Sequence, residues 1–88
     1  MTALVLIHAF PLSGAMWERE RRALRDVADP ILAPSLPGFG GTAVPRGEPS
    51  MDDYANAIIA AMDGAKIGRA AIAGLSLGGY VALAMWRR

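Results

Sequence analysis

Cysteine is absent from this sequence of 88 residues, and histidine occurs only once. Without thiols the chain has neither a disulfide scaffold nor a thiolate metal site, a composition typical of proteins of the reducing cytoplasm. One imidazole and acidic residues placed mostly on helix surfaces do not predict a metal site either. We therefore expect a cytoplasmic protein that binds no metal ion.

An excess of charge of one sign is also missing. Nine basic and eight acidic residues give a formal net charge of +1. This balance predicts no binding to nucleic acid or to an anionic membrane surface. The one basic cluster is interleaved with acids, as on a solvated helix face: Arg19, Arg21, Arg22 and Arg25 alternate with Glu18, Glu20 and Asp26.

No hydrophobic run is long enough to span a membrane. Ala70 to Trp86 is free of charge over 17 residues, but a span needs about 20, and glycines interrupt this one. The apolar N-terminus has no basic residue before it, and His8 and Pro11 interrupt it, which is not the pattern of a signal peptide. A buried strand followed by a buried helix is the better interpretation of the later run.

Strand and helix patterns alternate along the chain. Apolar runs predict strands, and helical spacing or capping signals predict helices. The strands are expected at Ala3–Ile7, Ile31–Ala33 and Arg69–Ala73, the helices at Gly14–Ala28, after Ser50 as far as Gly64, and at Leu77–Arg88, and a long loop at Ser35–Pro49. This order predicts an α/β fold: a three-stranded parallel sheet of order 2-1-3 with helices on both faces.

Two of these helices differ in how they end. Ser50 can cap its helix, with Asp53 at the capping-box position and Gly64 as a C-terminal stop. The last helix has no stop signal after Trp86, and a parallel sheet of three strands is small. We therefore expect residues 1–88 to form a single incomplete domain, the N-terminal portion of something larger.

One motif carries chemistry. Gly74-Leu75-Ser76-Leu77-Gly78 matches G-x-S-x-G and lies between a predicted strand and a predicted helix. In this setting a sharp turn projects the serine hydroxyl above the sheet, and the glycines allow strand and helix to approach closely. The helix N-terminus offers free amides to a developing oxyanion. The motif predicts a nucleophile elbow centred on Ser76.

Together with two further stretches, the elbow resembles the first half of the α/β-hydrolase fold, in its compact bacterial esterase and haloperoxidase-like branch. His8-Ala9-Phe10-Pro11 follows the first strand, and Leu36-Pro37-Gly38-Phe39-Gly40 follows the second. The resemblance covers positions 8 to 79 in the family's order. Ala9 stands where the family more often has glycine, and Ser35 where it often has an acidic residue.

The resemblance implies roles for four residues. Ser76 would be the acyl-accepting nucleophile, and the backbone amides of Leu77 and Phe10 would form the oxyanion hole. The family's acid and histidine follow later strands, and this chain stops before either, so we expect it to be nearly inert alone. His8 either braces the oxyanion loop, as in the family, or serves as an improvised base for Ser76.

No cofactor is expected. Gly38-Phe39-Gly40-Gly41 lies in a proline-rich loop rather than at a strand-to-helix turn, which does not fit a dinucleotide fingerprint, and no G-K-[ST] phosphate loop occurs.

Three functions stay open. The first is serine-dependent hydrolysis of small carboxylic esters or related acyl compounds by the full-length parent. The second is an inactive, self-associating fragment, truncated or engineered, because Ala70–Ala73 offers an uncharged, unpaired edge that favours a homo-oligomer. The third is a ligand-binding relic without turnover.

Overall fold

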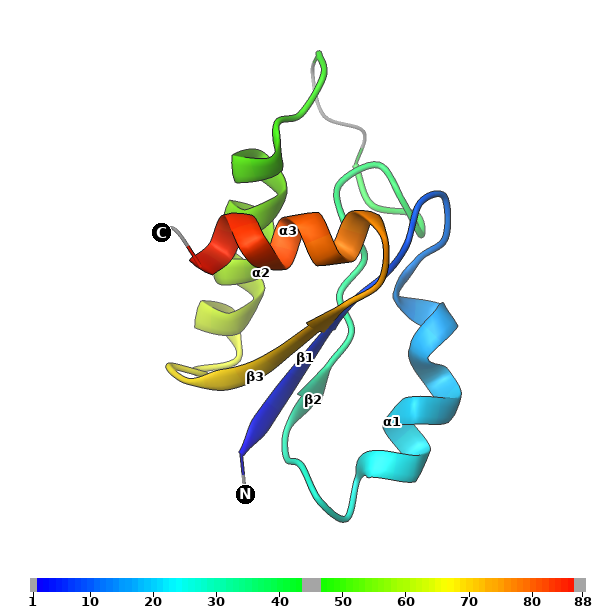
Figure 1. The fold of residues 1–88 in the computed structure, drawn as a ribbon, viewed down its shortest axis with the longest axis vertical. Helices are drawn as coiled ribbons and strands as arrows, with labels where there is room; N and C mark the ends of the chain where they lie inside the picture. The colour runs from blue at the N-terminus through cyan, green and yellow to red at the C-terminus, as the bar shows by residue number, and fades with distance from the viewer. Residues whose placement is uncertain (1, 44–46, 87–88) are drawn as a thin grey trace.

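A computed structural model describes residues 2–43 and 47–86 and contains three strands and four helical segments (Figure 1). Their order along the chain alternates as the sequence predicts. They are β1 (Ala3–Ile7), η1 (Gly14–Trp17), α1 (Glu18–Leu24), β2 (Ile31–Leu32), α2 (Met51–Gly64), β3 (Ala70–Gly74) and α3 (Leu77–Trp86).

The three strands form one parallel sheet of order β2-β1-β3. β1 pairs with β3 along its full length, from Ala3 beside Ala70 to Ile7 beside Gly74. The pairing with β2 is short and joins Leu4 to Ile31 and Val5 to Leu32. The predicted fold class and strand order are therefore confirmed, and the carboxyl ends of β1 and β3 lie at the same edge of the sheet.

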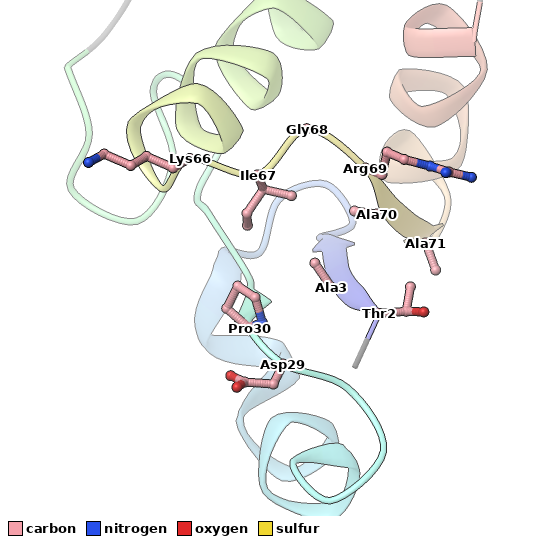
Figure 2. Close-up of a pocket in the computed structure, with 10 residues that line it drawn as sticks. All are labelled: Thr2, Ala3, Asp29, Pro30, Lys66, Ile67, Gly68, Arg69, Ala70 and Ala71. Carbon is pink, nitrogen blue, oxygen red and sulfur yellow. The ribbon is translucent and has the colours of Figure 1, made fainter.

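Helices cover both faces of this sheet (Figures 1 and 2). α2 and α3 lie on one side and α1 on the other. The main core forms under α2 and α3, where Val5 and Ile7 of β1 pack with Ile58 of α2 and Val81 of α3. Leu6 points to the opposite face because side chains alternate along a strand, and it is also buried.

The first predicted helix is shorter and less regular than expected. Instead of one helix over Gly14–Ala28, a 3-10 turn at Gly14–Trp17 leads into α1, which ends at Leu24. Ser13 begins this segment, since its side chain accepts a hydrogen bond from Ala15 N at 3.3 Å. α1 buries no residue of its own, so little packing holds its last turns in helical form.

Other boundaries shift by one or two residues. β2 ends at Leu32 rather than Ala33, and β3 runs over Ala70–Gly74 rather than Arg69–Ala73. Gly64 was expected to end α2, but it is the last residue within that helix. The residue in the left-handed conformation after α2 is instead Lys66, with φ 60°. α3 is described as far as Trp86, and the predicted continuation to Arg88 lies outside the described residues.

The predicted capping box of α2 is present. Asp53 N donates to Ser50 Oγ at 3.1 Å, and Ser50 N donates to Asp53 Oδ2 at 2.8 Å. These two bonds satisfy amides that the helix itself leaves unpaired. They fix the start of the helix that carries Ile58 into the core.

No helix in the ranges 2–43 and 47–86 is both long and apolar enough to cross a bilayer. The charge-free stretch from Ala70 is divided instead between β3 and α3.

Ser50→Ala is expected to lower the free energy of unfolding by about 1 kcal/mol, whereas Ser50→Gly costs only a few tenths. The physical reason is that alanine leaves the amide of Asp53 without its acceptor, while glycine lets water and the backbone compensate. Urea denaturation followed by circular dichroism measures both. Equal stability of wild type and Ser50→Ala would show that the cap contributes nothing.

Candidate functional site

The turn from β3 into α3 holds Ser76 in an unusual backbone conformation. Ser76 has φ 57°, in the left-handed region of backbone conformation that residues with a Cβ rarely adopt. Hydrogen bonds from Gly78 N to Leu75 O (3.0 Å) and from Gly79 N to Ser76 O (2.9 Å) close the turn directly into the helix. Ser76 is exposed, at the carboxyl edge of the sheet. Its backbone therefore has the conformation that the predicted elbow requires.

Two glycines make this turn possible because no Cβ fits at either position. A Cβ on Gly74 would overlap the backbone of Gly78, and a Cβ on Gly78 would overlap the carbonyl oxygen of Ile7. The first turn of α3 thus rests against both the end of β3 and the end of β1. The G-x-S-x-G spacing is explained here by two backbone contacts, one on each side of the serine.

The loop after β1 lies beside this turn. Leu75 N donates to Ile7 O at 3.2 Å, which ties the elbow to the last residue of β1. Beyond Ile7 the chain turns sharply, and Leu12 N donates to Ala9 O at 2.8 Å. Phe10 lies in this turn and is 67% exposed. The structure therefore brings the Phe10 loop and the elbow to one edge of the sheet.

Leu77 is the first residue of α3. The first four amides of an α-helix have no partner within the helix, and the helix dipole adds partial positive charge there. An oxygen carrying developing negative charge beside Ser76 would find a donor in the Leu77 amide.

His8 is fully buried, and both its ring nitrogens are engaged by backbone. Leu36 N donates to Nε2 at 2.9 Å, so Nε2 carries the lone pair, and the proton on Nδ1 is directed to Ala9 O at 2.9 Å. No lone pair is left to accept a proton from Ser76. This geometry favours the bracing interpretation of His8 over the improvised base.

Three aromatic rings in contact connect the buried His8 to the surface. The ring of Phe39 meets that of His8 edge-on, with centroids 5.3 Å apart, and meets that of Phe10 edge-on at 5.8 Å. Phe39 thus links the buried imidazole to the exposed loop residue. Phe39 is only a motif residue in the sequence, and this contact could not be predicted, because ring contacts between the loop after β1 and the loop after β2 leave no periodic signal.

Thr42 is a second residue that the sequence analysis missed. Its hydroxyl oxygen accepts from Gly38 N at 2.8 Å and lies 2.9 Å from Leu36 O, closing residues 36–42 into a compact loop. Ser35 joins this loop to η1, since its Oγ accepts from Gly14 N at 3.1 Å. A threonine within a loop rich in glycine and proline is the signal that could have suggested it, because threonine hydroxyls often bond backbone groups three or four residues earlier.

A hollow of about 710 Å³ lies at the opposite end of the sheet, at the amino ends of β1 and β3. Figure 2 shows its two basic side chains, Lys66 and Arg69, pointing away from each other, so they do not converge on one ligand. Within the described ranges no three acidic or histidine side chains gather to hold a metal ion.

Comparison with known proteins places this geometry in context. A family model described as "Alpha/beta hydrolase family" matches residues 4–88. The structure of a thermophilic esterase from Thermogutta terrifontis, with malate bound, is 34% identical with a TM-score of 0.92, and the match covers 100% of this chain and 32% of that one. A hydrolase from Pseudomonas aeruginosa PA01 is 26% identical with a TM-score of 0.80, covering 91% and 30% respectively. The chain therefore spans about a third of the length of these structures.

Gly78→Ala is expected to destabilise the fold by about 3 kcal/mol or more, because the new methyl group would collide with the Ile7 carbonyl. Gly79→Ala is the matched control one position on. Its Cβ would meet nothing closer than Gly74 O at 3.6 Å, and alanine favours the helix, so this variant should be as stable as wild type or more stable. Thermal unfolding measures both, and similar losses in the two variants would contradict the close approach.

Ser76→Gly should be about 1 kcal/mol more stable than Ser76→Ala. Alanine keeps the Cβ that is strained at φ 57°, whereas glycine adopts this conformation without penalty. Urea titration of the two variants tests this, since neither has the hydroxyl. If alanine proved the more stable, the left-handed conformation at this position would be wrong.

Proposed function

We propose that Ser76 is the acyl-accepting nucleophile of a hydrolase acting on small carboxylic esters or related acyl compounds. The chain belongs to the alpha/beta hydrolase family, which is the premise of this proposal. The observation that carries the proposal is the backbone of Ser76. A left-handed serine between two glycines that admit no Cβ, exposed at the carboxyl edge of a parallel sheet, supports a nucleophilic role. Strain of this kind is typical of functional positions.

The oxyanion hole is proposed to form from two backbone amides, those of Leu77 and Phe10. As Ser76 Oγ bonds to the ester carbonyl carbon, the carbonyl oxygen takes on negative charge. The amide at the start of α3 and the amide in the loop after β1 come from the two segments that the Leu75–Ile7 hydrogen bond holds together. Each donor of this type contributes roughly 2.7–4 kcal/mol to stabilising the transition state.

The proton of Ser76 must go to a base from outside residues 1–88. The single histidine of the chain has its Nε2 lone pair occupied by Leu36 N. In the proposed reaction an external base accepts the Oγ proton and returns it to the leaving alcohol, and water then releases the acid from the acyl-serine. The family supplies an acid and a histidine later in the chain order, which fits the one-third span of the two solved structures.

The experiment is covalent labelling of Ser76 in the 88-residue chain with a fluorophosphonate probe, with and without added imidazole. Oγ forms the bond to phosphorus, fluoride leaves, and imidazole takes the proton. Labelling should be very slow without imidazole and accelerate roughly tenfold with it, less than the ~10²–10⁴-fold typical of a positioned base. Intact mass spectrometry measures the fraction of the protein that carries the label. Probe that reacts with imidazole instead of protein therefore adds nothing to the signal.

Two variants control this measurement. Ser76→Ala should show no labelling at any imidazole concentration, and Ser50→Gly, which removes a different exposed hydroxyl, should label like wild type. A folded wild-type sample that imidazole does not accelerate would overturn the assignment of Ser76 as a nucleophile. Equal labelling of Ser76→Ala would do the same.

A further inference from the structure

The backbone amide of Ala9 is held by a sulfur atom. Ala9 N donates to Met16 Sδ at 3.3 Å, across seven residues of the chain. Ala9 is buried, with 8% of its surface exposed, and a buried amide without an acceptor destabilises a fold. A thioether is a weak acceptor that cannot donate, so the direction of this bond is unambiguous. Met16 therefore fixes the amide side of Ala9.

The carbonyl side of Ala9 is held as well. Its oxygen accepts from Leu12 N at 2.8 Å and from His8 Nδ1 at 2.9 Å. The peptide between Ala9 and Phe10 is trans, and in a planar trans peptide the N–H points away from the C=O. The two bonds to the carbonyl oxygen of Ala9 therefore also set the direction of the next amide, that of Phe10.

The Phe10 amide itself has a fixed direction and no partner. In the part of the chain that the structure describes, Phe10 N donates to no backbone or side-chain group. It lies in the turn beside the elbow, at the carboxyl edge of the sheet. Donors that are already in place need not reorient when negative charge develops on a reacting oxygen. The bonds of Ala9 thus prepare the neighbouring amide for that task.

Met16 is anchored from a different part of the chain. It belongs to η1, whose Gly14 N donates to Ser35 Oγ at 3.1 Å. A Cβ on Gly14 would overlap the carbonyl oxygen of Ala33, so η1 rests directly on the backbone that follows β2. The sulfur is therefore carried by a segment that β2 and its loop hold in place, and it can restrain Ala9 against that support.

We propose that Met16 is a positioning residue of the oxyanion hole: its sulfur holds Ala9 N, and this keeps Phe10 N directed at the oxygen of the reacting acyl group. The inference rests on the proposed function, in which Phe10 N is one of the two donors. Met16 itself makes no contact with the substrate in this role. Loss of the sulfur misaligns a donor without removing it, so the effect on rate should be smaller than the ~10²–10³-fold loss that follows removal of such a donor.

Fluorophosphonate labelling of Ser76 in the presence of imidazole tests the proposal, because the phosphoryl oxygen of the probe gains negative charge as Oγ attacks. Met16→Leu nearly conserves the side-chain volume but removes the acceptor, and it should label about tenfold more slowly than wild type. Met62→Leu is the matched control. Met62 is also half-buried but packs against the main core from α2, so this variant should label like wild type. Circular dichroism confirms that each variant is folded.

A double-mutant cycle separates positioning from a general structural effect. Residues 1–22 are synthesised as a thioester and joined to residues 23–88, which begin with a cysteine that desulfurisation converts to the native Ala23. The synthetic segment carries methionine or norleucine at position 16, so that a CH₂ group replaces the sulfur. It also carries an amide or an ester between Ala9 and Phe10, so that an oxygen replaces the Phe10 N–H. Norleucine should slow labelling about tenfold in the amide chain but less than about twofold in the ester chain, where no donor is left to position.

Each contrary outcome has a distinct meaning. Equal labelling of the methionine and norleucine chains would overturn the proposal and leave the role of Ser76 intact. The same slowing in the amide and ester chains would also overturn it, because Met16 would then act through a group other than Phe10 N. Absence of Ser76 labelling in the folded wild type would instead overturn the proposed function, and the role of Met16 with it.

Discussion

The contact on which the rest of the structure depends is that between the first turn of α3 and the carbonyl end of β1. Gly78 sits so close to Ile7 that no side-chain atom can separate them. This approach sets the distance between helix and sheet, and with it the turn in which Ser76 takes its left-handed conformation. The hydrogen bond from Leu75 to Ile7 then fixes the elbow against the neighbouring loop. A purely local strand-to-helix turn would lack this support from a second strand.

His8, which directly follows Ile7, connects the neighbouring loops. One buried imidazole joins the loop after β1, through Ala9, to the loop after β2, through Leu36. Phe39 extends the connection outward to Phe10. Two loops distant in sequence thereby depend on one side chain that is held as a neutral tautomer by backbone partners. A histidine used in this way adds order to a site without supplying a proton acceptor.

Sequence reasoning succeeded where a local pattern reports a local structure. The apolar run of β1, the capping box at Ser50 and the glycine spacing around Ser76 each predicted the feature that is present. It failed where packing decides. α1 ends at Leu24 instead of Ala28 and buries none of its own residues, and the left-handed residue after α2 is Lys66 rather than the expected glycine. The contacts of Phe39 with His8 and Phe10 also left no sequence pattern, since they join two loops that the sheet brings together.

The parts that hold Ser76 in place all belong to a contiguous stretch, from β1 through the first turn of α3. That stretch corresponds to about a third of the esterase from Thermogutta terrifontis. The backbone of Ser76 is therefore determined by atoms of other residues: the carbonyl group of Ile7 and the backbone of Gly74 and Gly78. A substitution at one of these residues would change the position of the Ser76 hydroxyl without altering the serine itself.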